Sequence, residues 1–318
     1  MLPLYEPEPE WAQASGALPK GDVCDVGVDQ DDNVYVLARD PVPLRIFNRA
    51  GGFLGSWGEG EFVRPHGLAM GRGDALFLTD EGSNRVGKYS QRGELLLDIA
   101  APDGGAPLMS GRPFNRCTHS AEAPNGDVYV SDGYGNARIH HYSAGGALIR
   151  SWGMSGTEPG QFNLPHNICI DRAGRILVAD RENHRIQVFD AEGRYLDQWN
   201  NLHRPCAIAL DAEEHVWVGE LGPGLAVNRF YPNLGCAVKR LDGSGRQVAR
   251  IGGDRPGAEP GRFVAPHGIA VDSLGDVYVA EVSHSQWGAL FPETAMPDGL
   301  PSLRKLRARR PVSRQAMS

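Results

Sequence analysis

The sequence has no run of about 18 apolar residues, no excess of basic charge and no closely spaced pair of cysteines. Without a long apolar run there is no candidate transmembrane helix, and the acidic start MLPLYEPEPE lacks the pattern of an export signal. We therefore expect a cytoplasmic location and no membrane partner. The five cysteines are odd in number and show no CxxC spacing, which disfavours a disulfide framework or a thiolate zinc site.

The overall charge is acidic. With a formal net charge of −7 and a sequence pI of about 5.8, the protein offers no general positive field for nucleic acid. The exception is a basic C-terminal stretch, formed by Arg304, Lys305, Arg307, Arg309 and Arg310. We expect a solvated tail there, although Leu303 and Leu306 are also compatible with a strand.

Turn-forming residues are abundant instead. The 41 glycines and 23 prolines make up about a fifth of the 318 residues without a collagen period, which favours many turns between short strands. A hydrophobic share of 41% is enough for a large buried core, so wholesale disorder is excluded.

One type of segment recurs six times along the chain. Each copy places a polar turn before a β-branched or aromatic run, and the copies end at Ala38, Asp80, Asp132, Asp180, Glu220 and Glu281. The spacings between these ends are 42, 52, 48, 40 and 61 residues, the range of one four-stranded propeller blade, with an insertion in the fifth interval. Because the carboxylates recur at a fixed place, we expect them to cap backbone amides rather than to catalyse.

Six such units predict an all-β fold, a six-bladed β-propeller whose ring closure removes free sheet edges. The repeats, with runs such as NRVGKYS, ARIHHYS and HRIQVFD, resemble the NHL type of propeller. We expect residues 1–20 to be an N-terminal extension, 21–310 a single propeller domain and 311–318 a tail. Residues 303–307 are the candidate strand for completing a blade shared with the N-terminus.

Three histidines share one repeat position. The residues fourteen places before the repeat ends open the predicted innermost strands, and they are Cys24, His66, Thr118, His166, Cys206 and His267. The histidines fall in units two, four and six, and each follows a proline. Alternate blades of a six-bladed ring lie about 120° apart, so the three imidazoles are expected to converge near the channel axis.

This arrangement suits a metal ion with three imidazole ligands and an open position. Zinc is the first choice, and nickel, iron or copper would accept the same ligands. The alternative is that the histidines only line a polar, water-filled channel.

Further candidates lie just after the repeat ends, at the predicted channel mouth. Arg39 is expected to bind a substrate carboxylate or carbonyl by a forked hydrogen bond. Tyr134 stands in a Gly-Tyr-Gly turn, where a nearby cation would lower its pKa and make it a general base; an exposed turn tyrosine is the alternative. Arg181 also follows a repeat end, whereas Arg116 and His119 flank Thr118, the position in the third unit that corresponds to the histidines; all three are candidate substrate contacts.

Together these motifs resemble the peptidyl-α-hydroxyglycine α-amidating lyase family, most specifically in SDGYGNARI and ADRENHRIQVF. That family is a six-bladed propeller that splits a hydroxylated glycine extension into a peptide amide and glyoxylate. The resemblance implies that His66, His166 and His267 bind zinc. It also implies that Tyr134 is the base acting on the substrate hydroxyl and that Arg39 helps to hold the substrate.

The chain departs from that family at three positions. Gly135 replaces a family cysteine, so the family's disulfide is absent. Ala265 replaces a methionine of the pocket wall, and Gly268 replaces an acidic calcium ligand, which puts the family's structural calcium in doubt. We expect no companion copper monooxygenase domain, and therefore a smaller substrate than a peptide hormone.

We therefore expect a metal-dependent lyase that cleaves the C–N bond of a carbinolamide or related α-hydroxylated small molecule to an aldehyde and an amide. A zinc-dependent amide or ester hydrolase that uses the same histidines, and a non-catalytic binding scaffold, are the alternatives. The insertion at residues 221–235 either covers the channel mouth or is a surface excursion. Nothing in the sequence indicates an obligate protein partner.

Overall fold

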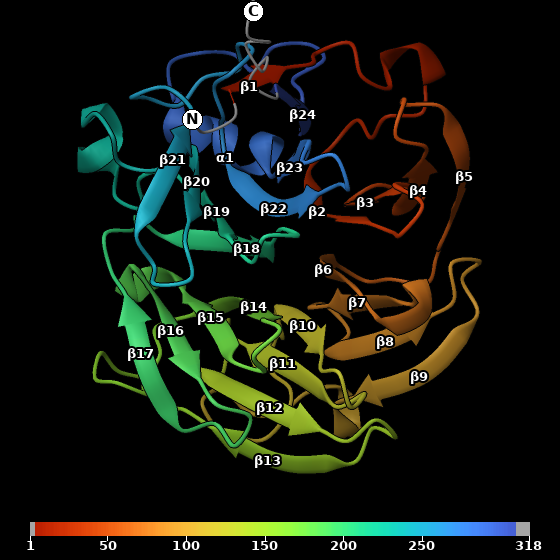
Figure 1. The fold of residues 1–318 in the computed structure, drawn as a ribbon, viewed down its shortest axis with the longest axis vertical. Helices are drawn as coiled ribbons and strands as arrows, with labels where there is room; N and C mark the ends of the chain where they lie inside the picture. The colour runs from red at the N-terminus through yellow and green to blue at the C-terminus, as the bar shows by residue number, and fades with distance from the viewer. Residues whose placement is uncertain (1–3, 310–318) are drawn as a thin grey trace, which may run out of the picture.

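The β-branched runs that define the six repeats form the second strand of six separate sheets. In the computed structural model, which describes residues 4–309, every residue of these runs is buried. Each sheet has four antiparallel strands, and the sheets surround a central axis as the blades of a propeller (Figure 1). The predicted fold class is therefore confirmed.

The blades follow the chain in order. Blade 1 consists of β2 (Val23–Val28), β3 (Val34–Ala38), β4 (Leu44–Phe47) and β5 (Phe53–Trp57). Blade 2 consists of β6 (Pro65–Met70), β7 (Leu76–Asp80), β8 (Arg85–Tyr89) and β9 (Leu95–Ala100). Blade 3 consists of β10 (His119–Glu122), β11 (Val128–Asp132), β12 (Arg138–Tyr142) and β13 (Leu148–Trp152).

The second half repeats this order. Blade 4 consists of β14 (Pro165–Ile170), β15 (Ile176–Asp180), β16 (Arg185–Phe189) and β17 (Tyr195–Trp199). Blade 5 consists of β18 (Pro205–Leu210), β19 (Val216–Glu220), β20 (Ala237–Leu241) and β21 (Gln247–Ile251). Blade 6 consists of β22 (Pro266–Val271), β23 (Val277–Glu281), β24 (Leu303–Arg309) and β1 (Leu4–Pro7).

Blade 6 closes the ring by joining the two ends of the chain. Residues 303–307 lie in β24, which confirms the prediction of a blade shared with the N-terminus. Within the predicted extension 1–20, β1 pairs with β24 and covers its free edge, so residues 4–7 belong to the propeller. The basic stretch is not a solvated tail over its described part: Lys305 and Leu306 are buried in β24, and Arg304 Nε lies 2.8 Å from Glu281 Oε1. The predicted tail at 311–318 lies outside the described residues.

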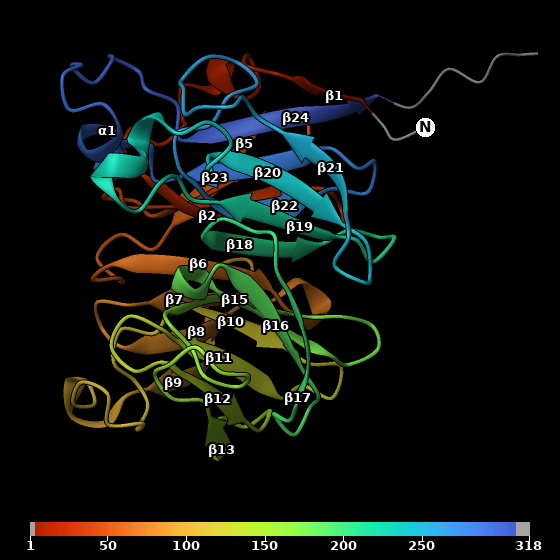
Figure 2. The ribbon, with the colours of Figure 1, turned by 90° about the vertical axis from the view of Figure 1, so that its left-hand side faces the viewer.

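The helical segments are short. They are η1 (Gln13–Ser15), η2 (Arg72–Asp74), η3 (Pro102–Gly104), η4 (Arg181–Asn183), η5 (Ala226–Phe230) and α1 (Ser283–Leu290). The insertion after β19 carries η5, which lies beside α1 (Figure 2). Arg229 Nε donates to the carbonyl of Ala289 at 2.9 Å. No helix within residues 4–309 is long and apolar enough to cross a membrane.

The acidic residues at the repeat ends cap backbone amides, as predicted. Asp80 accepts from the amide of Arg64 at 2.7 Å, and Asp180 accepts from that of Asn163 at 2.7 Å. Asp132, Glu220 and Glu281 make the corresponding bonds in their own blades. These five buried carboxylates fix the loops that lead into the innermost strands of blades 2 to 6, and so they place the residues at the starts of those strands.

Candidate metal centre

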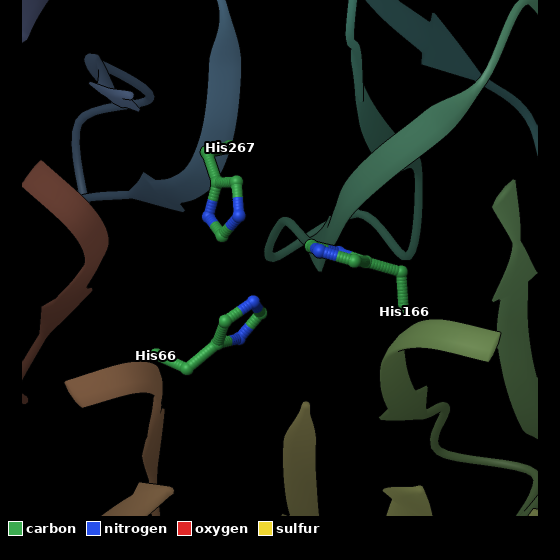
Figure 3. Close-up of side chains that lie close together, drawn as sticks. All are labelled: His66, His166 and His267. Carbon is green, nitrogen blue, oxygen red and sulfur yellow. The ribbon is translucent and has the colours of Figure 1, made fainter. Parts of the chain in front are cut away.

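His66, His166 and His267 stand at the start of the innermost strands β6, β14 and β22. In each strand the register with the second strand shifts across the histidine, from the proline before it to the residue after it. A β-bulge leaves the extra residue unpaired and turns its side chain out of the ladder. The three imidazoles therefore leave their sheets and point toward one another at the channel axis (Figure 3).

The three rings meet closely. Their centroids are 4.8–4.9 Å apart, and one ligand nitrogen from each histidine lies within 4.8 Å of the other two. All three side chains belong to buried residues. The convergence expected from the repeat register is thus present in the structure.

Each imidazole is oriented by the blade that follows it. Nδ1 of His66 lies 2.7 Å from the carbonyl oxygen of Thr118, Nδ1 of His166 lies 2.7 Å from that of Cys206, and Nδ1 of His267 lies 2.7 Å from that of Cys24. A carbonyl oxygen only accepts, so Nδ1 carries the hydrogen in all three rings. The lone pair of each neutral ring is then on Nε2.

The environment keeps these rings neutral. Burial lowers the pKa of His66 and of His166 well below the usual value, with further lowering by neighbouring histidines and arginines. Burial and then Arg39 lower the pKa of His267 to about 3. Histidine binds zinc as a neutral imidazole whose other nitrogen donates to a fixed acceptor, here a backbone carbonyl, so the donor set fits that ion.

Tyr134 reaches the histidines from the turn after β11. Its hydroxyl lies 3.0 Å from Nε2 of His66 and 3.2 Å from Nε2 of His166. The flanking glycines permit this turn, because a Cβ at Gly133 would lie 2.1 Å from the Pro165 carbonyl oxygen and one at Gly135 would lie 1.9 Å from Asn115 Oδ1. Burial raises the pKa of Tyr134, and the Arg181 guanidinium opposes that effect.

Two of the predicted arginines flank this tyrosine. The Cζ atom of Arg116 lies 4.7 Å from the centroid of the Tyr134 ring, and that of Arg181 lies 5.7 Å from it. Arg181 also makes an ion pair with Glu182 at 2.8 Å. Both arginines are therefore held at the end of the channel where the tyrosine meets the histidines.

Arg39 joins the same end of the channel through Glu81, a residue whose role sequence reasoning did not assign. Glu81 lies 4.0 Å from Arg39, accepts from Arg116 at 2.9 Å and contacts Arg64. Glu81 is almost fully buried, so it anchors three guanidinium groups around one carboxylate. Nε of Arg39 is buried and has no hydrogen-bond partner in the described structure, and Nη1 of Arg39 lies 3.5 Å from Asp22 Oδ2.

His119 is placed differently from the other candidate contacts. Its Nε2 lies 3.0 Å from Asp25 Oδ2 and 3.2 Å from the carbonyl oxygen of Leu68, so it is engaged with the channel wall. No hydrogen bond links it to Tyr134 or to the arginines among the described residues. Asp25 was not singled out from the sequence, because it shares no motif with the histidine segments.

A second, separate group of possible metal ligands is formed by Asp211, Glu213 and His215. Arg240 fills it: its Nη2 lies 2.6 Å from Asp211 Oδ2 and 3.0 Å from Nδ1 of His215. A guanidinium already satisfies these acceptors, so this cluster is a weaker candidate for a cation than the three histidines.

Comparisons with known proteins place the chain among NHL-repeat propellers. A family model described as NHL repeat matches residues 162–189 and 263–286. NHL repeat-containing protein 3 of Homo sapiens is 34% identical over 270 residues, which are 80% of this chain and 74% of that protein.

Other relatives carry an enzyme name. Peptidyl-alpha-hydroxyglycine alpha-amidating lyase 1 of Drosophila melanogaster is 38% identical over 251 residues, which are 71% of this chain and 44% of that protein. Among solved structures, a streptogramin B lyase aligns over 92% of this chain and 95% of its own with a TM-score of 0.61. At 14% identity, that last likeness concerns the fold alone.

Proposed function

We propose that this chain, which belongs to the family of NHL-repeat proteins, is a zinc-dependent lyase of the amidating-lyase type. Its substrate is a carbinolamide or a related small molecule with a hydroxyl on the carbon next to nitrogen. The observation that carries the proposal is the convergence of three buried, neutral imidazoles beside the hydroxyl of Tyr134.

His66, His166 and His267 would hold the zinc through Nε2, since Nδ1 of each ring is bonded to a backbone carbonyl. Zinc bound there would act as a Lewis acid on a substrate oxygen. With three protein ligands, a position remains open for that oxygen. Any other divalent transition metal that accepts imidazole would meet the same geometry.

Tyr134 moves the proton in the proposed reaction. Its phenolic oxygen takes the proton of the substrate hydroxyl, the hydroxyl-bearing carbon becomes a carbonyl group, and the C–N bond breaks. The leaving nitrogen then takes up a proton, so the products are an aldehyde and an amide, and no water is consumed. A cation beside the tyrosine and the Arg181 guanidinium both favour the phenolate over the neutral phenol.

Arg39, Arg116 and Arg181 bind and orient the substrate. A carboxylate or carbonyl on the aldehyde side of the scissile bond would meet guanidinium groups that Glu81 and Glu182 already hold in position. Preorganised donors contribute more than mobile ones, because they need no rearrangement when the substrate arrives.

Metal analysis of the purified protein tests the zinc site. We expect about one zinc per chain, lost in His166→Ala and retained in His215→Ala, since the second variant changes only the cluster filled by Arg240. A folded wild-type protein that takes up no divalent metal at neutral pH would refute the proposed function.

Product analysis separates the lyase from a hydrolase with the same ligands. We expect a synthetic N-acyl-α-hydroxyglycine to yield glyoxylate and the acyl amide, with no ¹⁸O from labelled water in the amide. Incorporation of ¹⁸O into a carboxylate product would instead indicate zinc-dependent hydrolysis.

A further inference from the structure

Asp25 and His119 form a buried hydrogen-bonded pair in the central channel. Asp25 belongs to the innermost strand of blade 1 and His119 to that of blade 3, and the two residues are 94 positions apart in the chain. Both residues are buried, and both line a channel cavity of about 280 Å³. The proposed reaction does not use either of them.

Blade 2 lies between the two partners and is bonded to both. The amide of Leu68 donates to Asp25 Oδ2 at 2.8 Å, and the carbonyl of Leu68 lies 3.2 Å from Nε2 of His119. The amide of Val26 donates to Asp25 Oδ1 at 2.9 Å. Since Nε2 of His119 faces only acceptors, it carries a hydrogen, and the pair links three consecutive blades.

Two glycines make room for this pair. A Cβ at Gly268 would lie 2.2 Å from Asp25 Oδ1, and a Cβ at Gly67 would lie 2.8 Å from Cδ2 of His119. Gly67 directly follows His66, and Gly268 directly follows His267. A side chain at either position would displace one partner of the pair.

The structural calcium that the family resemblance implies does not fit here. Its acidic ligand is replaced by Gly268, and the space beside Gly268 is filled by Asp25. The carboxylate of Asp25 is surrounded by N–H donors from Val26, Leu68 and His119, which are groups that repel a cation.

The pair lies next to the groups that orient two of the three histidines. Cys24, whose carbonyl binds Nδ1 of His267, directly precedes Asp25. Thr118, whose carbonyl binds Nδ1 of His66, directly precedes His119. The third carbonyl, that of Cys206, has Ala207 after it, so His166 is oriented without this pair.

We infer that the Asp25–His119 hydrogen bond is a calcium-independent brace that fixes the two backbone carbonyls orienting His66 and His267. Both are positioning residues, because they act through Cys24 and Thr118 rather than on substrate. The expected effect of the brace on zinc affinity rests on the proposed function. Its effect on the orientation of the His66 and His267 imidazoles does not. Groups that hold a metal-binding histidine in its orientation typically contribute 10- to 100-fold to metal affinity.

Imidazole NMR of the metal-free protein tests the brace directly. We expect slowly exchanging Nδ1–H signals from His66, His166 and His267 in the wild type. In His119→Phe, the signals of His66 and His267 should broaden or exchange faster, while that of His166 stays unchanged. His119→Gln, whose amide nitrogen can replace Nε2 as the donor, should restore most of the protection.

His141→Phe is the matched control. His141 lies in the same blade, and its Nε2 makes a comparable bond of 2.9 Å to Asp127 at the outer part of the blade. This variant should affect stability without changing the three Nδ1–H signals. If His119→Phe does not fold, Asp25→Ala removes the same bond and takes its place in the comparison.

Zinc and calcium titrations complete the test. We expect zinc to bind about 10-fold more weakly to His119→Phe than to His141→Phe, and added calcium to leave the Tm of the metal-free wild type unchanged. Unchanged protection of all three signals, or calcium-dependent stability in the wild type, would overturn the brace. Wild-type protein that binds no zinc but shows the selective NMR change would contradict only the proposed function.

Discussion

The hydroxyl of Tyr134 lies 3.0 Å from Nε2 of His66, although the two residues come from different blades. Blade 3 places a threonine, Thr118, where blades 2 and 4 place histidines. The hydroxyl of Thr118 is bonded to the Pro165 carbonyl at 3.0 Å and stays in the wall. Blade 3 therefore contributes no imidazole at the channel axis, and the Tyr134 side chain occupies the space on that side. Its hydroxyl contacts His66 and His166 there.

Removal of the Tyr134 hydroxyl should stop the reaction without removing the metal. We expect Tyr134→Phe to lower kcat by about 100-fold or more, the usual loss when a general acid–base group is removed, and to retain full zinc stoichiometry. Steady-state assays together with metal analysis measure both quantities.

Tyr129→Phe is the control for that change. It lies in the same blade, and its hydroxyl donates to the Ala191 carbonyl at 3.0 Å, away from the histidines. Normal turnover in Tyr134→Phe would show that another group moves the proton.

Arg39 should act on substrate binding more than on turnover. We expect Arg39→Lys to raise KM about 10-fold with a smaller change in kcat, because an ammonium group cannot make the forked hydrogen bond of a guanidinium. Arg45→Lys is a close match: its side chain is 15% exposed against 16% for Arg39, but it pairs with Asp40. Equal KM values for the two variants would argue against substrate binding by Arg39.

Metal removal should lower stability as well as activity. Zinc that binds the folded chain at about 1,000 times its Kd adds roughly 4 kcal/mol, which corresponds to a Tm difference of about 6 °C for a domain of this size. We expect chelation to produce this drop and zinc to reverse it. In His267→Ala, the Tm should be the same with zinc and with chelator.

The repeat register was sufficient to predict the propeller and the convergence of His66, His166 and His267. That success has a physical basis, because equivalent positions in a closed ring must face the same axis. Tyr134 was found from its flanking glycines, which have a steric reason in the close approach of Pro165 and Asn115.

Other features depend on contacts between blades that no repeat position encodes. Asp25 contacts His119 only because Gly268 and Gly67 leave space for the two side chains. Neither glycine has the positive φ of a turn, so the local sequence gives no reason to expect a glycine there. The outer strand β1 was missed because four residues carry too little alternation to be recognised before their partner β24 is known.

His203 should make the metal-free protein sensitive to mild acid. Burial, and then the charges of His184 and Arg204, lower the pKa of His203 to about 4. The unfolded chain takes up a proton near pH 6.5, but the folded chain does so only near pH 4. The unfolded state therefore binds more protons between these values, so stability falls as the pH decreases from about 6.5 to about 4. Because the ring is partly exposed, we expect a loss of about 1–2 kcal/mol rather than the full value of the shift.

Urea unfolding of the chelated wild type and of His203→Gln, at pH 7 and at pH 4.5, measures this effect. Both proteins retain the other buried histidines, so the difference between their unfolding free energies isolates His203. That difference should move in favour of the variant by about 1–2 kcal/mol on acidification, because glutamine takes up no proton. A difference that is the same at both pH values would show that His203 is protonated equally in the folded and unfolded chains.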